Sequence, residues 1–336
     1  MDKYKKIINQ TYNFIDLTEE ESTFIFNEIM EGKLSEIEIS SFLTALKMKG
    51  ESLNEILGAT KILRKKSKKI NSPENTIDTC GTGGDNIGTL NISTAAALVA
   101  ASLDIKIAKH GNRSVSSKSG SADVLEKLGI NINLDEKMIE KTLFERNFCF
   151  MFAQDFHNAM KFVGQVRKRL STRTIFNLLG PLLNPANTKK QLLGVYDKKW
   201  INTHINVLKT LKSEHVLVVH GLDGLDEISL SNKSHISELK DNKINEYIFN
   251  PEDIGYQLIN INEIKGGDSE YNAKQIMKML NGELPNFQKI IEINAGAVIY
   301  LSGKVKSIKE GASLAKKCIN DGKAKTYINS LINYLS

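Results

Sequence analysis

The pattern of apolar residues in this chain changes at the Asn-Ser-Pro sequence of residues 71–73, and this change limits the folds open to it. Before it, apolar residues recur at helical spacing. After it, from Thr76 on, short apolar runs alternate with helix-like stretches, which favours a largely parallel sheet covered by helices. We therefore predict an α/β protein with a small helical domain at 1–72 and a larger α/β domain at 73–336, a size that 336 residues allow.

Three capping boxes mark helix starts in the first part. In each, a hydroxyl residue is followed three positions later by a glutamate, and the two side chains satisfy free amides at the helix start, worth about 1 kcal/mol per cap. The pairs are Thr18 with Glu21, Ser35 with Glu38, and Ser52 with Glu55. Gly32 and Gly50 stand where the first two helices should end. Ser307 and Glu310 predict a further box among helices expected at 270–336.

Several apolar runs in the larger part predict strands. The runs assigned to the parallel sheet are 76–80, 105–108, 148–152, 192–196 and 215–220. Three later runs are separated by polar turns and predict an antiparallel extension, at 228–230, 235–239 and 243–249.

Charge and composition exclude some classes of protein. The net charge is +6, a mild excess that argues against a nucleic-acid partner, because such proteins usually gather their cations in one tract. The one dense basic run, at 64–69, is typical of a solvated helix end.

The three cysteines, Cys80, Cys149 and Cys318, are odd in number and far apart, which disfavours a disulfide framework or a zinc site. The first residues show no apolar core followed by a small-residue cleavage site, and no stretch reaches about 18 uninterrupted apolar residues. These features predict a cytoplasmic protein that does not bind a membrane.

A glycine-rich stretch, Gly81–Asp85, follows the first expected strand and precedes a helix that begins near Asn91. Glycines let backbone amides approach an anion, and the helix start adds free amides. The spacing matches neither the dinucleotide motif nor the P-loop. The stretch predicts a phosphate or pyrophosphate site, although a plain strand-to-helix turn remains open.

Two further regions, residues 109–123 and the Asp226-Glu227 pair, follow expected strands. Lys109–Ser117 and Ser119–Asp123 bring cations and hydroxyls to a strand end, where ligands bind in parallel sheets, and so suit a polyanion; a solvated loop is the alternative. Asp226 and Glu227 are adjacent carboxylates that would repel each other without a cation. They suit Mg²⁺, with Ser93 as a neutral oxygen ligand; an acidic surface turn is the alternative.

Together with Arg-Thr-Ile-Phe-Asn-Leu-Leu-Gly-Pro at 173–181, these motifs resemble the anthranilate phosphoribosyltransferase family over essentially the whole chain. The resemblance implies transfer of phosphoribose from phosphoribosyl pyrophosphate to the amine of anthranilate, with release of pyrophosphate, in tryptophan biosynthesis. It implies a nucleoside phosphorylase/phosphoribosyltransferase-like fold whose helical domain is completed by helices from about 165–190. It also implies a homodimer joined through that domain.

The resemblance assigns site residues by motif. Those for phosphoribosyl pyrophosphate are Gly81, Gly84, Asp85, Thr89, Asn91, Ile92, Ser93, Thr94, Lys109, His110, Gly111, Asn112, Arg113, Ser114, Val115, Ser116, Ser117 and Ser121. Those for anthranilate are Gly81, Asn112 and Arg167, and those for two Mg²⁺ ions are Ser93, Asp226 and Glu227. No residue is assigned as an essential acid or base, because an aromatic amine is already a neutral nucleophile and needs positioning above all.

The chain departs from the family pattern at Asn158, Gln165 and Ser171, all around the aromatic substrate. Two other interpretations are a pyrimidine nucleoside phosphorylase of the same architecture and a nucleic-acid-binding relative without activity. The Asp226-Glu227 pair fits magnesium-pyrophosphate chemistry better than the first. The retained Arg167 and the mild net charge argue against the second.

Overall fold

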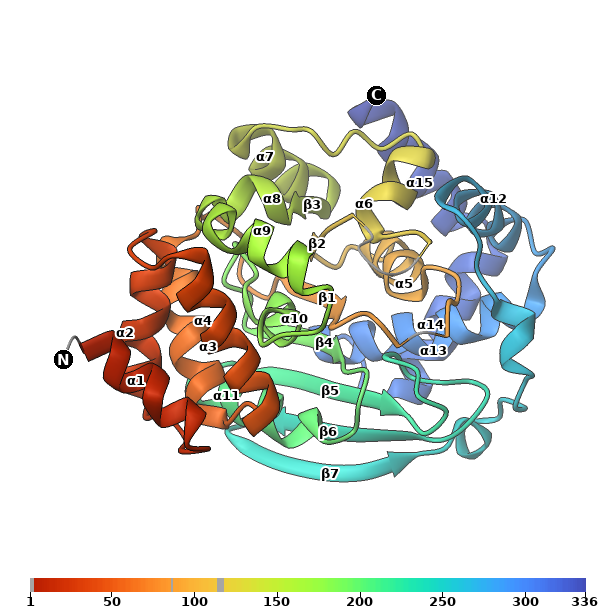
Figure 1. The fold of residues 1–336 in the computed structure, drawn as a ribbon. Helices are drawn as coiled ribbons and strands as arrows, with labels where there is room; N and C mark the ends of the chain where they lie inside the picture. Colours follow the sequence, from red (N-terminus) through yellow and green to blue (C-terminus); the bar gives the residue numbers. More distant parts are fainter. Residues whose placement is uncertain (1–2, 86, 114–117) are drawn as a thin grey trace.

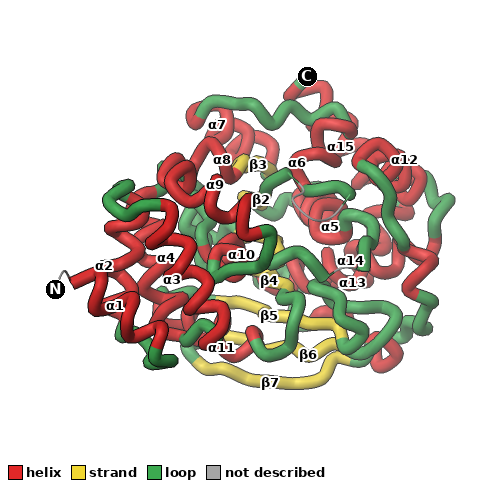
Figure 2. The backbone as a smooth tube through the Cα atoms, viewed as in Figure 1, coloured by secondary structure: helices red, strands yellow, loops and turns green. Residues whose placement is uncertain are grey.

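The computed structural model describes residues 3–85, 87–113 and 118–336, and it is built on one seven-stranded sheet (Figures 1 and 2). The strands, in the order in which they lie side by side, are β3 (Phe148–Phe152), β2 (Ile107–Gly111), β1 (Ile77–Gly81), β4 (Lys190–Gly194), β5 (His215–Gly221), β6 (Ser234–Lys240) and β7 (Lys243–Phe249). The first five are parallel, and β6 and β7 extend the sheet in antiparallel fashion. The predicted mostly parallel α/β sheet is confirmed.

Some strand predictions need correction. The run 228–230 is not a strand. The backbone of Ile228 bonds instead to the side chain of Asn294, which accepts from its N–H and donates to its carbonyl. β2 begins at Ile107 rather than at Ile105, because the parallel register starts it opposite Ile77 of β1.

The N-terminal part is a bundle of α1 (Lys3–Tyr12), α2 (Glu19–Met30), α3 (Glu36–Lys49) and α4 (Leu53–Lys66). All three predicted capping boxes begin helices there. The fourth is only half formed: the Ser307 hydroxyl accepts from the Glu310 N–H, but the Glu310 carboxylate bonds to the N–H of Lys306 instead.

Two helices from the middle of the chain share the core of this bundle. They are α9 (Lys161–Leu170), which packs against α2 and α3, and α10 (Phe176–Leu179). The rings of Phe26 and Phe176 meet edge to face with centroids 5.9 Å apart. Figure 1 shows α9 and α10, in green, beside the red and orange bundle. A domain boundary at residue 72, with helices returning from about 165–190, stays a prediction.

The strands separate two cores, because side chains alternate between the faces of the sheet. On β5, Val216 and Val218 join the core that contains the bundle, while Leu217 and Val219 join the other. α11 (Trp200–Thr210) packs against β5 and β6 on the bundle side.

The other core is built from helices on the opposite face of the sheet. Its helices are α5 (Ile92–Ala101), α6 (Ser121–Lys127), α12 (Ser269–Leu280), α13 (Pro285–Ser302), α14 (Ile308–Asn320) and α15 (Lys323–Leu335). α7 (Glu136–Arg146) packs on β3, and α8 (Ala153–Phe156) follows that strand. Within the described ranges, no helix has both the length and the apolar character needed to span a bilayer.

Candidate active site

The glycine-rich loop after β1 is held against the Asp226-Glu227 segment by close backbone contact. Gly83 and Gly84 have φ of +66° and +74°, a conformation that favours glycine. The N–H of Gly83 donates to Oδ2 of Asp226 at 2.8 Å. A Cβ atom on Gly81 would lie 2.5 Å from the same oxygen, and one on Gly194 would collide with the Asp226 carbonyl oxygen. The glycines are therefore needed for the approach of this carboxylate.

The structure brings together the three residues predicted to bind metal. Ser93 lies in the first turn of α5, and its N–H donates to Oε1 of Glu227 at 3.1 Å, although the two residues are 134 positions apart. Asp226, the residue before Glu227, accepts a hydrogen bond from the glycine loop. The glycine loop and the acidic pair, which were predicted separately from the sequence, thus lie together in one site.

The two carboxylates are crowded. Both side chains keep some contact with solvent, but protein atoms surround their acidic groups. Burial, followed by the charge of Asp85, raises the pKa of Asp226 to about 7. Burial, followed by the charge of Asp226, raises the pKa of Glu227 to about 8. A divalent cation between such groups would favour their ionised forms, so the pair fits Mg²⁺.

This pair does not enclose a metal by itself. Across the described residues, no group of three or more His, Cys, Asp and Glu side chains is arranged to hold an ion. Mg²⁺ commonly binds through one or two carboxylates together with substrate phosphates and water. The donor set therefore fits an ion that arrives with a phosphorylated substrate.

Lys109 lies beneath the loop and does not project into it. Its side chain is 1% exposed, and its ammonium group donates to the Thr79 carbonyl at 2.5 Å and to Oγ of Ser93 at 3.3 Å. Burial lowers its pKa, and the charge of Asp78 opposes this shift. The ammonium group therefore fixes β1 to the start of α5 and supplies positive charge under the site.

Residues 264–272, to which the sequence analysis assigned no role, hold the chain between the glycine loop and α5 in place. The Gly266 N–H donates to the Gly88 carbonyl at 2.8 Å, and Thr89 forms an isolated bridge with Lys265. From α12, the Asn272 amide donates to Oδ1 of Asn91 at 2.8 Å. No motif marks residues 264–272, so only the fold reveals this role.

Arg173 is a second contact that the sequence interpretation left without a role. Its guanidinium group donates to the carbonyl of Gly84 and lies over the ring of Tyr196, 4.0 Å from the centroid. Its charge also acts to lower the pKa values of Asp85 and Asp226. Arg173 therefore links the segment before α10 to the glycine loop.

The loop after β2 is placed only in part. Arg113 is engaged by carboxylates of α6, with Nη1 3.1 Å from Asp123 and Nη2 2.8 Å from Glu126. The Ser121 hydroxyl donates to the Asn112 carbonyl at 3.4 Å. The predicted residues Ser114, Val115, Ser116 and Ser117 lie outside the described residues.

On the α9 side, Arg167 is half-buried, and its guanidinium carbon lies 5.3 Å from the centroid of the Phe176 ring. Burial lowers its pKa. No ion pair joins Arg167 to a carboxylate within residues 3–85, 87–113 and 118–336. A half-buried guanidinium group without an acidic partner suits a ligand carboxylate.

Two buried histidines lie near this side. Nε2 of His110 is 3.2 Å from Nε2 of His157. Burial lowers the pKa of His110 to about 3 and that of His157 to about 4, so both rings are neutral at pH 7. Gln154 adds a long contact of 3.5 Å from its amide to Oδ1 of Asn112.

The three departures from the family pattern occupy the ends and surface of α9. Asn158 begins a 3-10 turn before the helix, and Gln165 is exposed on it. Ser171 ends the helix with φ of +49°, where a glycine adopts the left-handed conformation without strain.

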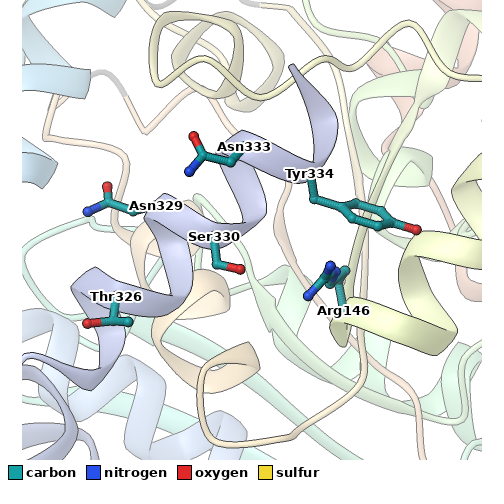
Figure 3. Close-up of a pocket in the computed structure, with 6 residues that line it drawn as sticks. All are labelled: Arg146, Thr326, Asn329, Ser330, Asn333 and Tyr334. Carbon is teal, nitrogen blue, oxygen red and sulfur yellow. The ribbon is translucent and has the colours of Figure 1, made fainter.

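Two hollows in the surface lie apart from these residues. One, of about 550 Å³, is lined by Arg146 and by residues of α15 (Figure 3). The other, of about 450 Å³, lies beside α4. Neither is lined by the glycine loop or by the acidic pair, so the candidate site is identified by the chemistry of its residues.

Comparison with known proteins places both parts of the chain. Residues 5–67 match the helical bundle domain of a glycosyl transferase family, and residues 73–325 match the a/b domain of the same family. Anthranilate phosphoribosyltransferase of Alkaliphilus metalliredigens is 47% identical over 319 residues, or 94% of each chain. This chain belongs to the anthranilate phosphoribosyltransferase family. The Methanobrevibacter smithii member is 43% identical over 330 residues, or 98% of each chain.

Solved structures of the family have the same fold. The enzyme from Thermus thermophilus superposes with a TM-score of 0.90 at 35% identity, covering 98% of this chain and 99% of that one. The enzyme from Saccharomyces cerevisiae, solved in complex with PRPP and Mg, gives a TM-score of 0.87 at 26% identity and covers 98% of both chains. The resemblance seen in the sequence motifs is thus confirmed at the level of family and fold.

Proposed function

We propose that this protein transfers the phosphoribosyl group of phosphoribosyl pyrophosphate to the amine of anthranilate, releasing pyrophosphate, as a step of tryptophan biosynthesis. The observation that carries the proposal is the meeting of the glycine loop, the start of α5 and the Asp226-Glu227 pair in one site. The family member from Saccharomyces cerevisiae was solved in complex with PRPP and Mg and, separately, in complex with 4-fluoroanthranilate.

The loop and α5 would bind the phosphates. The positive end of the α5 dipole and the left-handed backbone of the glycine loop favour an anion, even though the N–H groups of Gly83 and Ser93 are bonded to Asp226 and Glu227. Among the residues that the structure describes, the buried hydroxyl of Thr94 has no hydrogen-bond partner, so it is available to a polar ligand. Arg173 and the 264–266 segment would keep the loop in place.

Ser93, Asp226 and Glu227 would hold Mg²⁺, and we propose two ions per chain. Bound Mg²⁺ supplies charge neutralisation for the departing pyrophosphate. The protein's own contribution is to fix the two carboxylates through the N–H groups of Gly83 and Ser93. A displacement at the anomeric carbon then requires the amine to be positioned on the opposite side.

Anthranilate would lie between the glycine loop and α9, with its carboxylate on Arg167 and further contacts from Asn112 and Gly81. The neutral His110 and His157 add no charge there. No residue is given the role of an essential base, because the amine of anthranilate is a nucleophile without deprotonation.

The test is loss of anthranilate fluorescence when phosphoribosyl pyrophosphate is added to the purified protein with Mg²⁺. We expect turnover that stops on addition of a chelator and returns with excess Mg²⁺. No turnover of anthranilate, together with phosphorolysis of thymidine, would assign the protein to the nucleoside phosphorylase alternative.

We also propose that the protein is cytoplasmic, in line with the free state of all three cysteines. We further propose that it forms a homodimer joined through the helical bundle. Several large apolar side chains are exposed on the bundle and on α9: Tyr12, Phe14, Ile15, Ile37, Met48 and Phe162. Exposed apolar side chains are often covered in a protein–protein contact. Ile37 and Met48 are 79% and 71% exposed, so Ile37→Glu with Met48→Glu should yield monomers in light scattering without unfolding the chain.

A further inference from the structure

The basic run at 64–69 has no role in the proposed reaction, yet part of it surrounds a hollow in the surface. The hollow has a volume of about 450 Å³ and lies where the end of α4 meets the loop before β4. Lys61, Arg64, Lys65 and Lys69 supply four of its seven lining residues, and none of the seven is acidic. Cations gathered around a concave surface attract anions.

Arg64 is the best-placed donor in this hollow. Its Nε donates to the Leu182 carbonyl at 2.6 Å, and its Nη1 donates to Oδ1 of Asn187 at 3.3 Å. Both acceptors are neutral, and three of the five guanidinium N–H donors remain for a ligand. Burial lowers the pKa of Arg64 to about 10, so its charge is only weakly compensated by its surroundings.

The neighbouring lysines divide into two sets. Lys66 pairs with Glu31 at 3.0 Å, and Lys68 pairs with Glu136 at 2.9 Å, so both charges are compensated outside the hollow. In contrast, the one hydrogen bond that the Lys69 ammonium group makes to a described residue is to the Ser67 hydroxyl, at 2.9 Å. Burial and the charge of Arg64 lower its pKa.

Counter-charge is therefore scarce around the hollow itself. Of its four cations only Lys61 has an acidic partner, Glu19, within the part of the chain that the structure describes.

Two of the segments that connect the bundle to the larger part line the hollow. One wall contains Ile70, whose N–H donates to the Pro185 carbonyl at 3.4 Å, and the other contains Pro185 itself. Close by, the Ser72 hydroxyl donates to the carbonyl of Ala186 at 3.2 Å. The first segment enters β1 at Ile77, at the opposite end of the strand from the glycine loop.

We propose that this hollow is a second anion site, which binds a small phosphate-bearing ligand between Arg64, Lys65 and Lys69. A doubly charged oxyanion matches the free guanidinium donors and the two ammonium groups. Binding there would hold the two connecting segments together and stabilise the arrangement of the bundle on the larger part. The ligand is either free phosphate or the phosphoryl group of a metabolite.

The test is thermal unfolding of the full chain in increasing sodium phosphate, with ionic strength held constant by sodium chloride. The variant is Lys65→Gln with Lys69→Gln. The matched control, Lys66→Gln with Lys68→Gln, removes the same charge from the same run but leaves the hollow intact. Ligands that bind only the folded state raise the unfolding temperature along a saturable curve.

We expect the unfolding temperatures of the wild type and the control to saturate with the same midpoint phosphate concentration. For Lys65→Gln with Lys69→Gln, that midpoint concentration should rise about tenfold or more, the size expected from losing two charge-assisted contacts. Lys65→Arg with Lys69→Arg should restore the wild-type midpoint. Equal midpoints in all the proteins would place the phosphate in the reaction site and overturn the proposal, as would an unsaturated rise common to all.

The same titration with glycerol 3-phosphate distinguishes the two sources. A lower midpoint than with phosphate assigns the hollow to a metabolite's phosphoryl group. A higher midpoint assigns it to free phosphate.

Discussion

The phosphate side of the site and the α9 side are held in place by different kinds of contact. On the phosphate side, Gly81, Gly83 and Gly194 allow backbone and carboxylate to approach so closely that a side chain would collide or be strained. On the α9 side, Arg167 and His157 are placed by the packing of side chains. A site built on backbone tolerates little change, whereas one built on side chains can vary residue by residue. The three departures from the family pattern lie on the second side.

The largest effect should come from the carboxylates that the glycine loop holds. Asp226→Asn with Glu227→Gln keeps the shape of both side chains but removes the charge proposed to hold Mg²⁺. We expect kcat/KM to fall by about 1000-fold or more, and the remaining activity to respond little to Mg²⁺ concentration. Activity would be followed by anthranilate fluorescence over a range of Mg²⁺ concentrations.

The same double variant has a structural control. Because burial disfavours the charged forms of Asp226 and Glu227, neutral side chains should leave the unfolding temperature unchanged or higher in Mg²⁺-free buffer at pH 8. Unaltered activity with unaltered Mg²⁺ dependence would show that the ions are held elsewhere.

On the α9 side, Arg167→Ala should raise the KM for anthranilate by about 10- to 100-fold, the value of one charge-assisted contact of about 1.5–3 kcal/mol. The KM for phosphoribosyl pyrophosphate should change much less. Arg169 is a matched control on the same helix, since it is exposed and its one acidic partner among the described residues is Glu36, at 3.2 Å. Arg169→Ala should leave both constants near the wild-type values. An equal rise in the KM values for both substrates in Arg167→Ala would show that Arg167 does not bind the anthranilate carboxylate.

A smaller effect concerns how Mg²⁺ changes stability with pH. The raised pKa values mean that the folded protein holds protons on Asp226 and Glu227 that the unfolded chain has lost above about pH 5. This contribution to stability is present at low pH and disappears as the pH rises through about 7 to 8. Mg²⁺ competes with those protons, so it should raise the unfolding temperature more at pH 8.5 than at pH 6. Calorimetry at the two pH values checks this, and a larger gain at pH 6 would contradict it.

The same division, between features set by the local backbone and contacts set by side-chain packing, separates what the sequence alone could predict from what it could not. The capping boxes and the glycine loop depend on local backbone rules, so Thr18, Gly81 and their neighbours could be interpreted without a structure. Arg173 and Asn272 could not, because their partners Gly84 and Asn91 lie 89 and 181 residues away and the contact depends on how the helices pack.

The prediction of a strand at 228–230 was wrong for a similar reason. Its apolar residues are buried as expected, but the buried Asn294 of α13 takes the hydrogen bonds that a neighbouring strand would otherwise make. Burial was predictable from hydrophobicity, and the backbone partner was not.

The smallest effect is expected from substituting two glycines, Gly164 on the α9 side and Gly81 on the phosphate side. Gly164 lies inside α9, and a Cβ atom there would have no neighbour within 4 Å, so Gly164→Ala should stabilise the chain by about 0.5–1 kcal/mol through the higher helix propensity of alanine. Gly81→Ala should destabilise it and lower activity, because the added carbon meets Asp226. Chemical denaturation of both variants measures the difference. A loss of stability in Gly164→Ala would show that the position has no room for the added carbon and would contradict this prediction.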